Sequence, residues 1–308
     1  MKVIYYNAVD PEDHGQQFQQ LVPEAEVRLW REGDHDAADY ALVWRPPAAM
    51  LKGRSDLKAI FNMGAGVDAI LKLNQDIPSH VPIIRIEDAG MGEQMADYAS
   101  IAVLRYYRQF DLYQNQQERH AWVQKKPASK SDFRLAVLGL GVLGQVIVQR
   151  LLALNFPVSG WSRSQKNIDG VRCFSGEDGL AQCLASANAV VSILPLTVET
   201  TGILNRATLS HLPKGAFLIN VGRGAHVVEE DLLALLQSGH LAGATLDVFQ
   251  TEPLPDHHPF WGRSDVTITP HISALTLVEE GNAQIAEKLR RLEQGLAVTG
   301  EINRSTGY

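Results

Sequence analysis

A glycine-rich hexapeptide constrains the fold of this chain more than any other feature. It comprises Gly139, Leu140, Gly141, Val142, Leu143 and Gly144. An apolar run at residues 134–138 precedes it as a predicted strand, and an apolar helical segment follows at residues 145–154. In that setting the first glycine permits a tight turn, the second lets backbone N–H groups approach a pyrophosphate, and the third lets the helix pack on the strand. The loop therefore predicts a dinucleotide site at a helix N-terminus, although a ligand-free turn can share the spacing.

The size and charge of the chain narrow the classes of protein. Its 308 residues are about twice a common domain of ~150, so we expect two domains. The formal charge of −7 argues against a nucleic-acid partner. No uncharged apolar run reaches the ~18 residues that a membrane span needs. Residues 1–10 lack an apolar core of signal-peptide length, so we expect no membrane partner and a cytoplasmic location.

The cysteines and histidines give no metal signature. Cys173 and Cys183 are too few for a disulfide framework and wrongly spaced for a zinc site. The adjacent pair His257 and His258 lies in a proline-flanked loop, where solvated side chains are the simpler interpretation. We therefore expect no metal.

Apolar runs separated by polar connections predict parallel α/β sheets in both halves of the chain. In the N-terminal third, strands are predicted at residues 2–6, 26–29, 40–43, 57–62 and 83–86, with helices at 16–21 and 67–74. A single long helix is predicted from residue 93 to about 117, and a surface linker at 127–131. Further strands are predicted at 158–161, 189–194, 216–220, 243–247 and 266–269, with helices at 178–185, 229–238 and 277–293.

The end of the strand at residues 158–161 indicates which dinucleotide fits. An NAD site usually has Asp or Glu about 20 residues after the glycines, to bind the ribose hydroxyls. This chain instead has Ser162, Arg163 and Ser164, and no carboxylate before Asp169. Neutral serines remove repulsion toward a 2′-phosphate, and an arginine can bind it with charge-assisted hydrogen bonds. The sequence favours NADPH, with NADH as a weaker cofactor; a solvated surface arginine is the alternative.

Three further motifs follow predicted strands. They are Asn220-Val221-Gly222-Arg223-Gly224, Asp247-Val248-Phe249-Gln250-Thr251-Glu252-Pro253 and Thr269-Pro270-His271. With the glycine loop they resemble the D-isomer-specific 2-hydroxyacid dehydrogenase family over nearly the whole chain. Two more segments resemble its glyoxylate/hydroxypyruvate reductase A subgroup, namely Val43-Trp44-Arg45-Pro46-Pro47 and Gly90-Met91-Gly92-Glu93-Gln94-Met95.

The resemblance implies three catalytic residues for the reduction of a 2-oxo acid. His271 would donate the proton, since histidine exchanges protons near neutral pH. Glu252 would be its carboxylate partner and favour the protonated ring. Arg223 would bind the substrate carboxylate and the 2-oxo oxygen. Each alone has a structural or solvated alternative, but ligands of open α/β sheets bind at strand ends, where all three are predicted. The other nine of the ten histidines have no such placement.

The resemblance also implies residues that line the two ligands. The loop of Gly64, Ala65 and Gly66 is similar to the family's substrate loop, and its N–H groups can form a nest for a carboxylate; an ordinary turn is the alternative. Trp44 would wall the substrate pocket and favour small substrates, or else be a core residue. The cofactor would be lined by Leu194, Pro195, Leu196 and Asp247, with Asp247 near the nicotinamide carboxamide. The Met95-Ala96-Asp97-Tyr98 segment departs from the family pattern, so Asp97 receives no role.

The expected fold class is α/β, with two Rossmann-like or flavodoxin-like parallel-sheet domains and the cofactor domain inserted into the substrate domain. Residues 1–97 and 273–308 would form the substrate domain, and residues 98–272 the NAD(P)-binding Rossmann domain. The active site is expected in the cleft between them. The family commonly dimerises through its cofactor domain, which implies a homodimer.

The resemblance implies an NADPH-dependent reductase of small 2-oxo acids. Glyoxylate would give glycolate, and hydroxypyruvate would give D-glycerate. The nearest alternative is an NADH-dependent D-lactate or D-3-phosphoglycerate dehydrogenase. A more distant one is a dinucleotide-sensing corepressor or scaffold built on the same fold.

Overall fold

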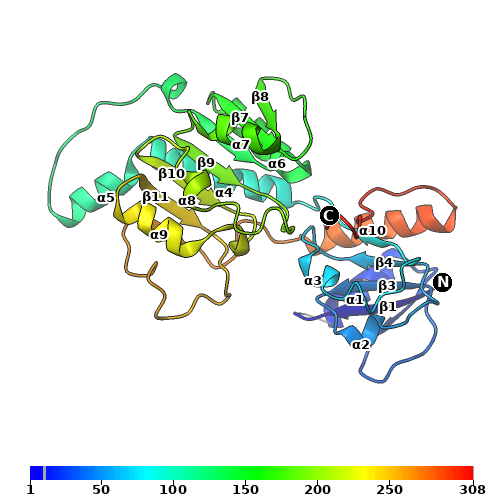
Figure 1. The fold of residues 1–308 in the computed structure, drawn as a ribbon. Coiled ribbons are helices and arrows are strands. Elements are labelled where there is room, and N and C mark those ends of the chain that lie inside the picture. The colour runs from blue at the N-terminus through cyan, green and yellow to red at the C-terminus, as the bar shows by residue number, and fades with distance from the viewer. Residues whose placement is uncertain (10–11, 308) are drawn as a thin grey trace. The chain divides into compact units, whose positions relative to one another are not determined.

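The computed structural model describes residues 1–9 and 12–307, which fall into two compact units. Unit 1 comprises Met1–Met91 and Thr276–Tyr308, and unit 2 comprises Gly92–Leu275 (Figure 1). Unit 2 is therefore inserted into the chain of unit 1. Each unit contains one sheet in which every strand pair is parallel. This confirms the predicted fold class of two parallel-sheet α/β domains.

The sheet of unit 1 has the strand order β2-β1-β3-β4-β5. Its strands are β1 (Lys2–Asn7), β2 (Glu26–Leu29), β3 (Tyr40–Trp44), β4 (Ala59–Asn62) and β5 (Ile83–Arg85). The central strands are buried on both faces, and their apolar side chains form the core of the unit. Because the chain direction across the sheet reverses between β1 and β3, the ends of these strands mark a preferred ligand position in such folds.

Four helices accompany the sheet within the described residues of unit 1. They are α1 (Glu12–Leu21), α2 (Ala48–Leu51), α3 (Asp68–Leu71) and α10 (Val278–Glu293). Ile285 and Leu289 lie on the buried face of α10. The Tyr40 hydroxyl donates to the Glu293 carboxylate at 2.6 Å, which ties the end of α10 to β3. The helix predicted at residues 67–74 is wrong in length, because only four residues are helical before the chain continues as turns.

The sheet of unit 2 has the order β12-β11-β10-β9-β6-β7-β8. Its strands are β6 (Leu135–Leu138), β7 (Val158–Ser162), β8 (Val171–Ser175), β9 (Ala189–Ser192), β10 (Ala216–Asn220), β11 (Leu241–Leu246) and β12 (Val266–Ile268). The order in which successive strands are added to the sheet reverses between β6 and β9: β7 and β8 lie beyond β6, and β10, β11 and β12 lie beyond β9. The helices are α4 (Met91–Tyr107), α5 (Phe110–Glu118), α6 (Val142–Ala153), α7 (Gly176–Leu184), α8 (Arg206–Leu209) and α9 (Glu229–Gln237), with short 3₁₀ turns η1 (Lys130–Asp132) and η2 (Gly224–His226).

Three predictions of secondary structure in unit 2 are wrong. The single helix expected over residues 93–117 is two helices, because Gln109 adopts a left-handed conformation with φ of 57°. Neither Gly nor Pro marks that break, so the pattern concealed it. Helix α6 begins three residues earlier than predicted, directly after an extended Gly141. Strand β8 was missed because it is a half-exposed edge strand with Arg172 on its open face.

In the described part of the chain, no helix combines the length and the apolar character needed to cross a membrane.

Candidate active site

His271 and Glu252 form a hydrogen-bonded pair beyond the last two strands of unit 2. His271 follows β12, and Glu252 lies in the loop after β11. The His271 Nδ1 atom lies 2.8 Å from the Glu252 Oε2 atom, and 37% and 35% of the two side chains remain exposed. A carboxylate can only accept, so Nδ1 holds a proton, and the second ring nitrogen, Nε2, takes no part in this bond. The structure thus brings together the two side chains that the resemblance pairs.

Asp247, at the end of β11, fixes the segment that contains His271. Its backbone carbonyl accepts from the His271 N–H at 2.9 Å. Its carboxylate accepts from the Thr269 hydroxyl at 2.6 Å and from the N–H groups of Ile272 and Ser273, both at 2.8 Å. The side chain is fully buried. These bonds hold His271 at φ of 55°, a left-handed conformation that non-glycine residues rarely adopt.

Tyr98 extends this network from helix α4. Its hydroxyl lies 2.5 Å from Thr269 Oγ1, and since that hydroxyl donates to Asp247, Tyr98 must be the donor. Burial raises the pKa of Tyr98 to about 12, so it keeps its proton at neutral pH. The departure from the family pattern at residue 98 therefore has a structural use. Asp97, which received no role, pairs with Arg150 of α6.

Arg223 lies in the loop after β10, beside the β11 loop. The two loops meet at Gly224, where an added Cβ would lie 1.8 Å from the carbonyl carbon of Phe249. The Phe249 N–H in turn donates to Glu252 at 3.1 Å. Buried Asn220 donates to the Arg223 carbonyl at 3.0 Å and fixes the turn. Arg223, Glu252 and His271 thus come from loops that follow three adjacent strands, β10, β11 and β12.

One histidine was dismissed wrongly. His226 is fully buried beside Arg223, whose backbone N–H lies 3.2 Å from the His226 Nδ1 atom. The opposite ring nitrogen, Nε2, lies 3.2 Å from the Pro195 carbonyl oxygen. The prediction that no other histidine is placed near these residues is therefore wrong. Its position three residues after Arg223 places it in the same loop, whereas the contact to Pro195, 31 residues away, has no signal in the sequence.

The glycine loop of unit 2 has the geometry that a pyrophosphate needs. Gly139 has φ of 106°, and a Cβ there would lie 2.7 Å from the Ile193 carbonyl oxygen. A Cβ on Gly144 would lie 1.9 Å from the Gly139 carbonyl oxygen. A Cβ on Gly141 would meet nothing within 4 Å. The first and third glycines are therefore needed because backbone atoms lie too close for a side chain, whereas the second borders open space. At the adjacent start of α6, the N–H groups of Val142 and Leu143 have no acceptors within the helix.

The other predicted cofactor residues also lie at the carboxyl ends of the unit 2 strands. Ser162 ends β7, and its hydroxyl donates to the Ser164 carbonyl at 2.8 Å, while Arg163 and Ser164 are exposed. Buried Leu194 and half-buried Pro195 and Leu196 follow β9. Strands β6 and β9 flank the point where the strand order reverses, which is the usual ligand position in open parallel sheets.

In unit 1, the loop of Gly64, Ala65 and Gly66 turns its carbonyl groups inward. The buried Asn62 amide donates to the Gly64 carbonyl at 2.7 Å and to the Gly66 carbonyl at 3.0 Å. Arg85 Nη1 donates to the Ala65 carbonyl at 3.3 Å. Within residues 1–9 and 12–307, no acceptor is found for the three N–H groups of this loop. They remain available to an anion, without help from a long helix. Neither Asn62 nor Arg85 was singled out from the sequence.

Trp44, at the end of β3, lies directly against this loop. A Cβ on Gly64 would lie 2.1 Å from the Trp44 Cζ3 atom, so only glycine fits beside the indole. Trp44 is half-buried, and the exposed Arg45 guanidinium lies 5.5 Å from the centre of its ring. The indole is therefore a wall of the loop and not an interior core residue.

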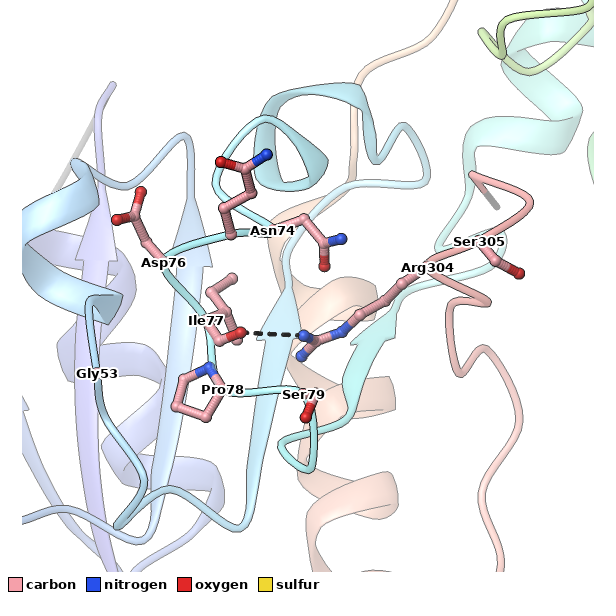
Figure 2. A pocket seen from close by; sticks show the side chains of 9 residues that line it. Gly53, Asn74, Asp76, Ile77, Pro78, Ser79, Arg304 and Ser305 are labelled. Carbon is pink, nitrogen blue, oxygen red and sulfur yellow. Dashed lines mark hydrogen bonds between the residues drawn. The ribbon is translucent and has the colours of Figure 1, made fainter.

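A separate surface pocket of about 690 Å³ lies at the other end of the unit 1 sheet (Figure 2). Its lining includes Asn74, Asp76 and Ser79, which precede β5 in the chain. Arg304 points into it, but its guanidinium donates to the Ile77 carbonyl at 3.2 Å. The pocket is thus distinct from the strand ends where the candidate site residues gather.

Comparison with known proteins agrees with this geometry. Residues 101–273 match the family profile described as "D-isomer specific 2-hydroxyacid dehydrogenase, NAD binding domain". The chain is 47% identical to glyoxylate/hydroxypyruvate reductase A of Serratia proteamaculans (strain 568), over 100% of both chains.

Two solved structures are similar over nearly their whole length. A D-isomer specific 2-hydroxyacid dehydrogenase from Xanthobacter autotrophicus Py2, in complex with NADPH and MES, is 39% identical with a TM-score of 0.94 and coverage of 100% of this chain and 99% of the other. The NADPH-dependent glyoxylate/hydroxypyruvate reductase of Sinorhizobium meliloti, in complex with NADP and sulfate, is 34% identical with a TM-score of 0.92 and the same coverage. The resemblance to the reductase A subgroup is confirmed. The chain belongs to the D-isomer specific 2-hydroxyacid dehydrogenase family.

Proposed function

We propose that this protein is an NADPH-dependent reductase of small 2-oxo acids, which converts glyoxylate to glycolate and hydroxypyruvate to D-glycerate. The observation that carries the proposal is the His271–Glu252 pair at 2.8 Å, formed by the loops after β12 and β11, with Arg223 on the loop after the next strand, β10. The names of the Serratia and Sinorhizobium relatives support the same activity.

NADPH fits the residues at the carboxyl ends of the unit 2 strands. The open space at Gly141 and the N-terminus of α6 suit its pyrophosphate. Exposed Arg163, between two serines, suits the 2′-phosphate. The segment Leu194, Pro195 and Leu196 would line the nicotinamide, and Asp247, which also supports the His271 segment, would lie near its carboxamide. When bound, this cofactor supplies a hydride from its nicotinamide C4 atom.

The side chains of unit 2 perform the remaining chemistry. His271 donates a proton from Nε2 to the oxygen that becomes the hydroxyl group. Glu252 accepts the Nδ1 hydrogen bond and stabilises the charged ring before that transfer. Arg223 pairs with the substrate carboxylate and polarises the keto group. Uptake of one hydride and one proton balances the reduction.

We assign substrate binding also to unit 1 and cofactor binding to unit 2. The inward carbonyls of residues 64–66 support the role of that loop as a carboxylate-binding nest, with Trp44 as its wall. The proposed division at residues 97 and 273 lies within six residues of the unit limits, which follow Met91 and Leu275. The family match over residues 101–273 supports the assignment of unit 2.

A matrix of cofactors and substrates tests the function. We expect purified protein to oxidise NADPH with glyoxylate and hydroxypyruvate, and to prefer both acids over pyruvate and phosphohydroxypyruvate. His271→Gln should lower kcat by about 100-fold or more while NADPH still binds, since general acid catalysis contributes ~10²–10⁴-fold. Activity with NADH and pyruvate alone would favour a D-lactate dehydrogenase. An unaffected biological activity of His271→Gln would favour the corepressor or scaffold.

We further propose that the protein is a cytoplasmic homodimer without a nucleic-acid or membrane partner. Large apolar side chains are exposed along α4, α5 and the segment that extends after α5 (Figure 1), namely Ile101, Phe110, Trp122 and Val123 at 69%, 61%, 101% and 55%. Both cysteines are free thiols, which suits a reducing compartment. Light scattering on the wild type and on Trp122→Ser tests the dimer, and a monomeric wild type would contradict it.

A further inference from the structure

The ring of His226 connects two loops that the proposed function assigns to different ligands. His226 ends the turn η2 after β10, and its side chain is fully buried. Its Nδ1 atom faces the Arg223 N–H at 3.2 Å, and its Nε2 atom faces the Pro195 carbonyl at 3.2 Å. A backbone N–H can only donate and a carbonyl can only accept. Both contacts are therefore satisfied only when Nε2 holds the proton and Nδ1 holds none.

The surroundings of the ring are closely packed and hydrogen-bonded. A Cβ on Gly222 would lie 3.2 Å from two of its ring atoms and 3.1 Å from the Leu194 carbonyl oxygen, so the β10 loop packs closely on both. The His226 carbonyl accepts from the Leu204 N–H at 2.8 Å, which attaches the turn to the segment that follows β9. The Pro195 carbonyl also accepts from the Thr200 hydroxyl at 2.6 Å. The ring is thus fixed at both of its nitrogen atoms.

We propose that His226 is a positioning residue, which as the neutral Nε2–H tautomer holds substrate-binding Arg223 in register with cofactor-lining Pro195. The inference rests on the proposed function, because that function gives the two neighbours their roles. His226 is fully buried and acts through these two neighbours. Its effect is preorganisation: a fixed spacing between the β9 and β10 loops lowers the ordering cost when keto group and nicotinamide meet.

Two substitutions separate the two contacts. A glutamine amide can reach the position of Nε2 and donate to Pro195, and an asparagine oxygen can reach the position of Nδ1 and accept from Arg223. We expect His226→Gln to weaken binding of oxamate, an unreactive 2-oxo acid analogue, by about tenfold, with NADPH affinity changed less than about twofold. His226→Asn should weaken NADPH binding by about tenfold and change oxamate affinity less than about twofold. His226→Phe keeps the ring volume, loses both bonds and should weaken both ligands.

The binding measurements need no turnover. NADPH affinity follows from its fluorescence on titration with protein, and oxamate affinity from calorimetry with NADPH present. Equal affinities for both ligands in all three variants would overturn the proposal, and so would equal losses of both ligands in His226→Gln and His226→Asn. Failure of the function proposed above appears separately, as a wild type that reduces no 2-oxo acid.

The tautomer itself can be observed in the wild type. Nitrogen-15 NMR of histidine-labelled protein at pH 7.5 should give one ring with the shifts of a neutral Nε2–H imidazole, absent from the spectrum of His226→Gln. This measurement remains decisive if a variant does not fold, because the resonance can then be assigned by its contact with the Arg223 amide. An Nδ1–H tautomer or a charged ring at that pH would refute the proposal.

Discussion

Each unit places a glycine-rich loop after a buried strand, but the two loops are built differently. In unit 2, Gly139 and Gly144 pack against backbone atoms, and the 12-residue helix α6 follows. In unit 1, residues 64–66 are held by the side chains of Asn62 and Trp44, and the helix that follows has four residues. The first loop is therefore bounded by backbone atoms, whereas the second is held and bounded by side chains.

This difference determines what each loop tolerates. A backbone obstruction cannot be relieved by a substitution elsewhere, because no side chain can be shortened to make room. An obstruction by a side chain can be relieved by truncating that side chain. Five substitutions, ordered from the largest effect to the smallest, test this distinction and extend it to the ligands of each unit.

Gly144→Ala should have the largest effect. The new Cβ would lie 1.9 Å from the Gly139 carbonyl oxygen, so β6 and α6 must separate. We expect a loss of at least ~3 kcal/mol of unfolding free energy, measured by chemical denaturation. Gly141→Ala is the matched control, since its Cβ meets nothing within 4 Å. It should keep the stability of the wild type and raise the KM for NADPH. Similar stability of the two variants would contradict the backbone argument.

Gly64→Ala should cost somewhat less and should be rescuable. Its Cβ would lie 2.1 Å from Trp44 Cζ3, and the half-buried indole must move. We expect Gly64→Ala to lower the free energy of unfolding by about 2 kcal/mol in the wild type. In a protein that already has Trp44→Ala, it should lower that free energy little further. A double-mutant cycle from four denaturation curves gives this coupling. Additive effects would mean that the two loops do not differ as described.

Arg163→Asp should change the cofactor preference without changing stability. The side chain is exposed at the end of β7, and an aspartate there would repel a 2′-phosphate and accept from ribose hydroxyls. We expect the ratio of kcat/KM for NADPH over NADH to fall by about 20-fold, since charge-assisted hydrogen bonds contribute ~1.5–3 kcal/mol. Steady-state kinetics with both cofactors measures it. An equal loss for both would show that Arg163 does not contact the phosphate.

The parallel sheets could be predicted because their strands are buried on both faces. Runs such as residues 135–138 and 189–192 are continuously apolar, and only a strand fits their length and flanking turns. The edge strand Val171–Ser175 lacks that pattern because half of it faces solvent. The break at Gln109 could not be predicted either, since a left-handed residue other than glycine has no sequence signature.

The candidate site was predictable where a motif follows a strand, as for Arg223 and His271. Their supports were not, because each depends on a partner distant in sequence. Tyr98 reaches Thr269 across 171 residues, and His226 reaches Pro195 across 31. Such contacts can be predicted only when the order of the strands in the sheet is known. Glu252 is intermediate: its pairing with His271 was inferred from the family, and the adjacency of β11 and β12 in the sheet explains the proximity.

Asn62→Ala tests whether the unit 1 loop binds a carboxylate. The variant removes both donors to the Gly64 and Gly66 carbonyls, so the loop is free to turn its N–H groups away. We expect the KM for glyoxylate to rise by about tenfold, from a loss of ~1–1.5 kcal/mol, with the KM for NADPH unchanged. Asn74→Ala, in the pocket at the other end of the sheet, is the matched control and should change neither constant. A parallel rise in both KM values would indicate a general loss of structure.

The smallest effect is expected at two arginine–aspartate pairs, one in each unit, whose members are two residues apart in sequence. Arg54 binds Asp56 at 2.8 and 2.7 Å, and Arg263 binds Asp265 at 2.8 and 2.6 Å. Asp56 also accepts from the Ala38 N–H at 3.0 Å, and its arginine is more buried, at 11% against 21% exposed. The hydrogen bonds of Arg54 lower the pKa of Asp56 from 3.8 to about 2.

A folded-state pKa below the unfolded value stabilises the fold above pH ~4, and the contribution is lost as the pH falls from about 4 to about 2. At pH 7, Asp56→Asn should therefore cost about 1 kcal/mol after allowance for solvent screening, and Asp265→Asn about half of that. Denaturation curves at pH 7 and pH 2.5 check both values, and the Asp56→Asn difference should fall to about a third at the lower pH, which is still above the folded pKa. An undiminished difference at pH 2.5 would mean that Asp56 stabilises unit 1 through packing and not through its charge.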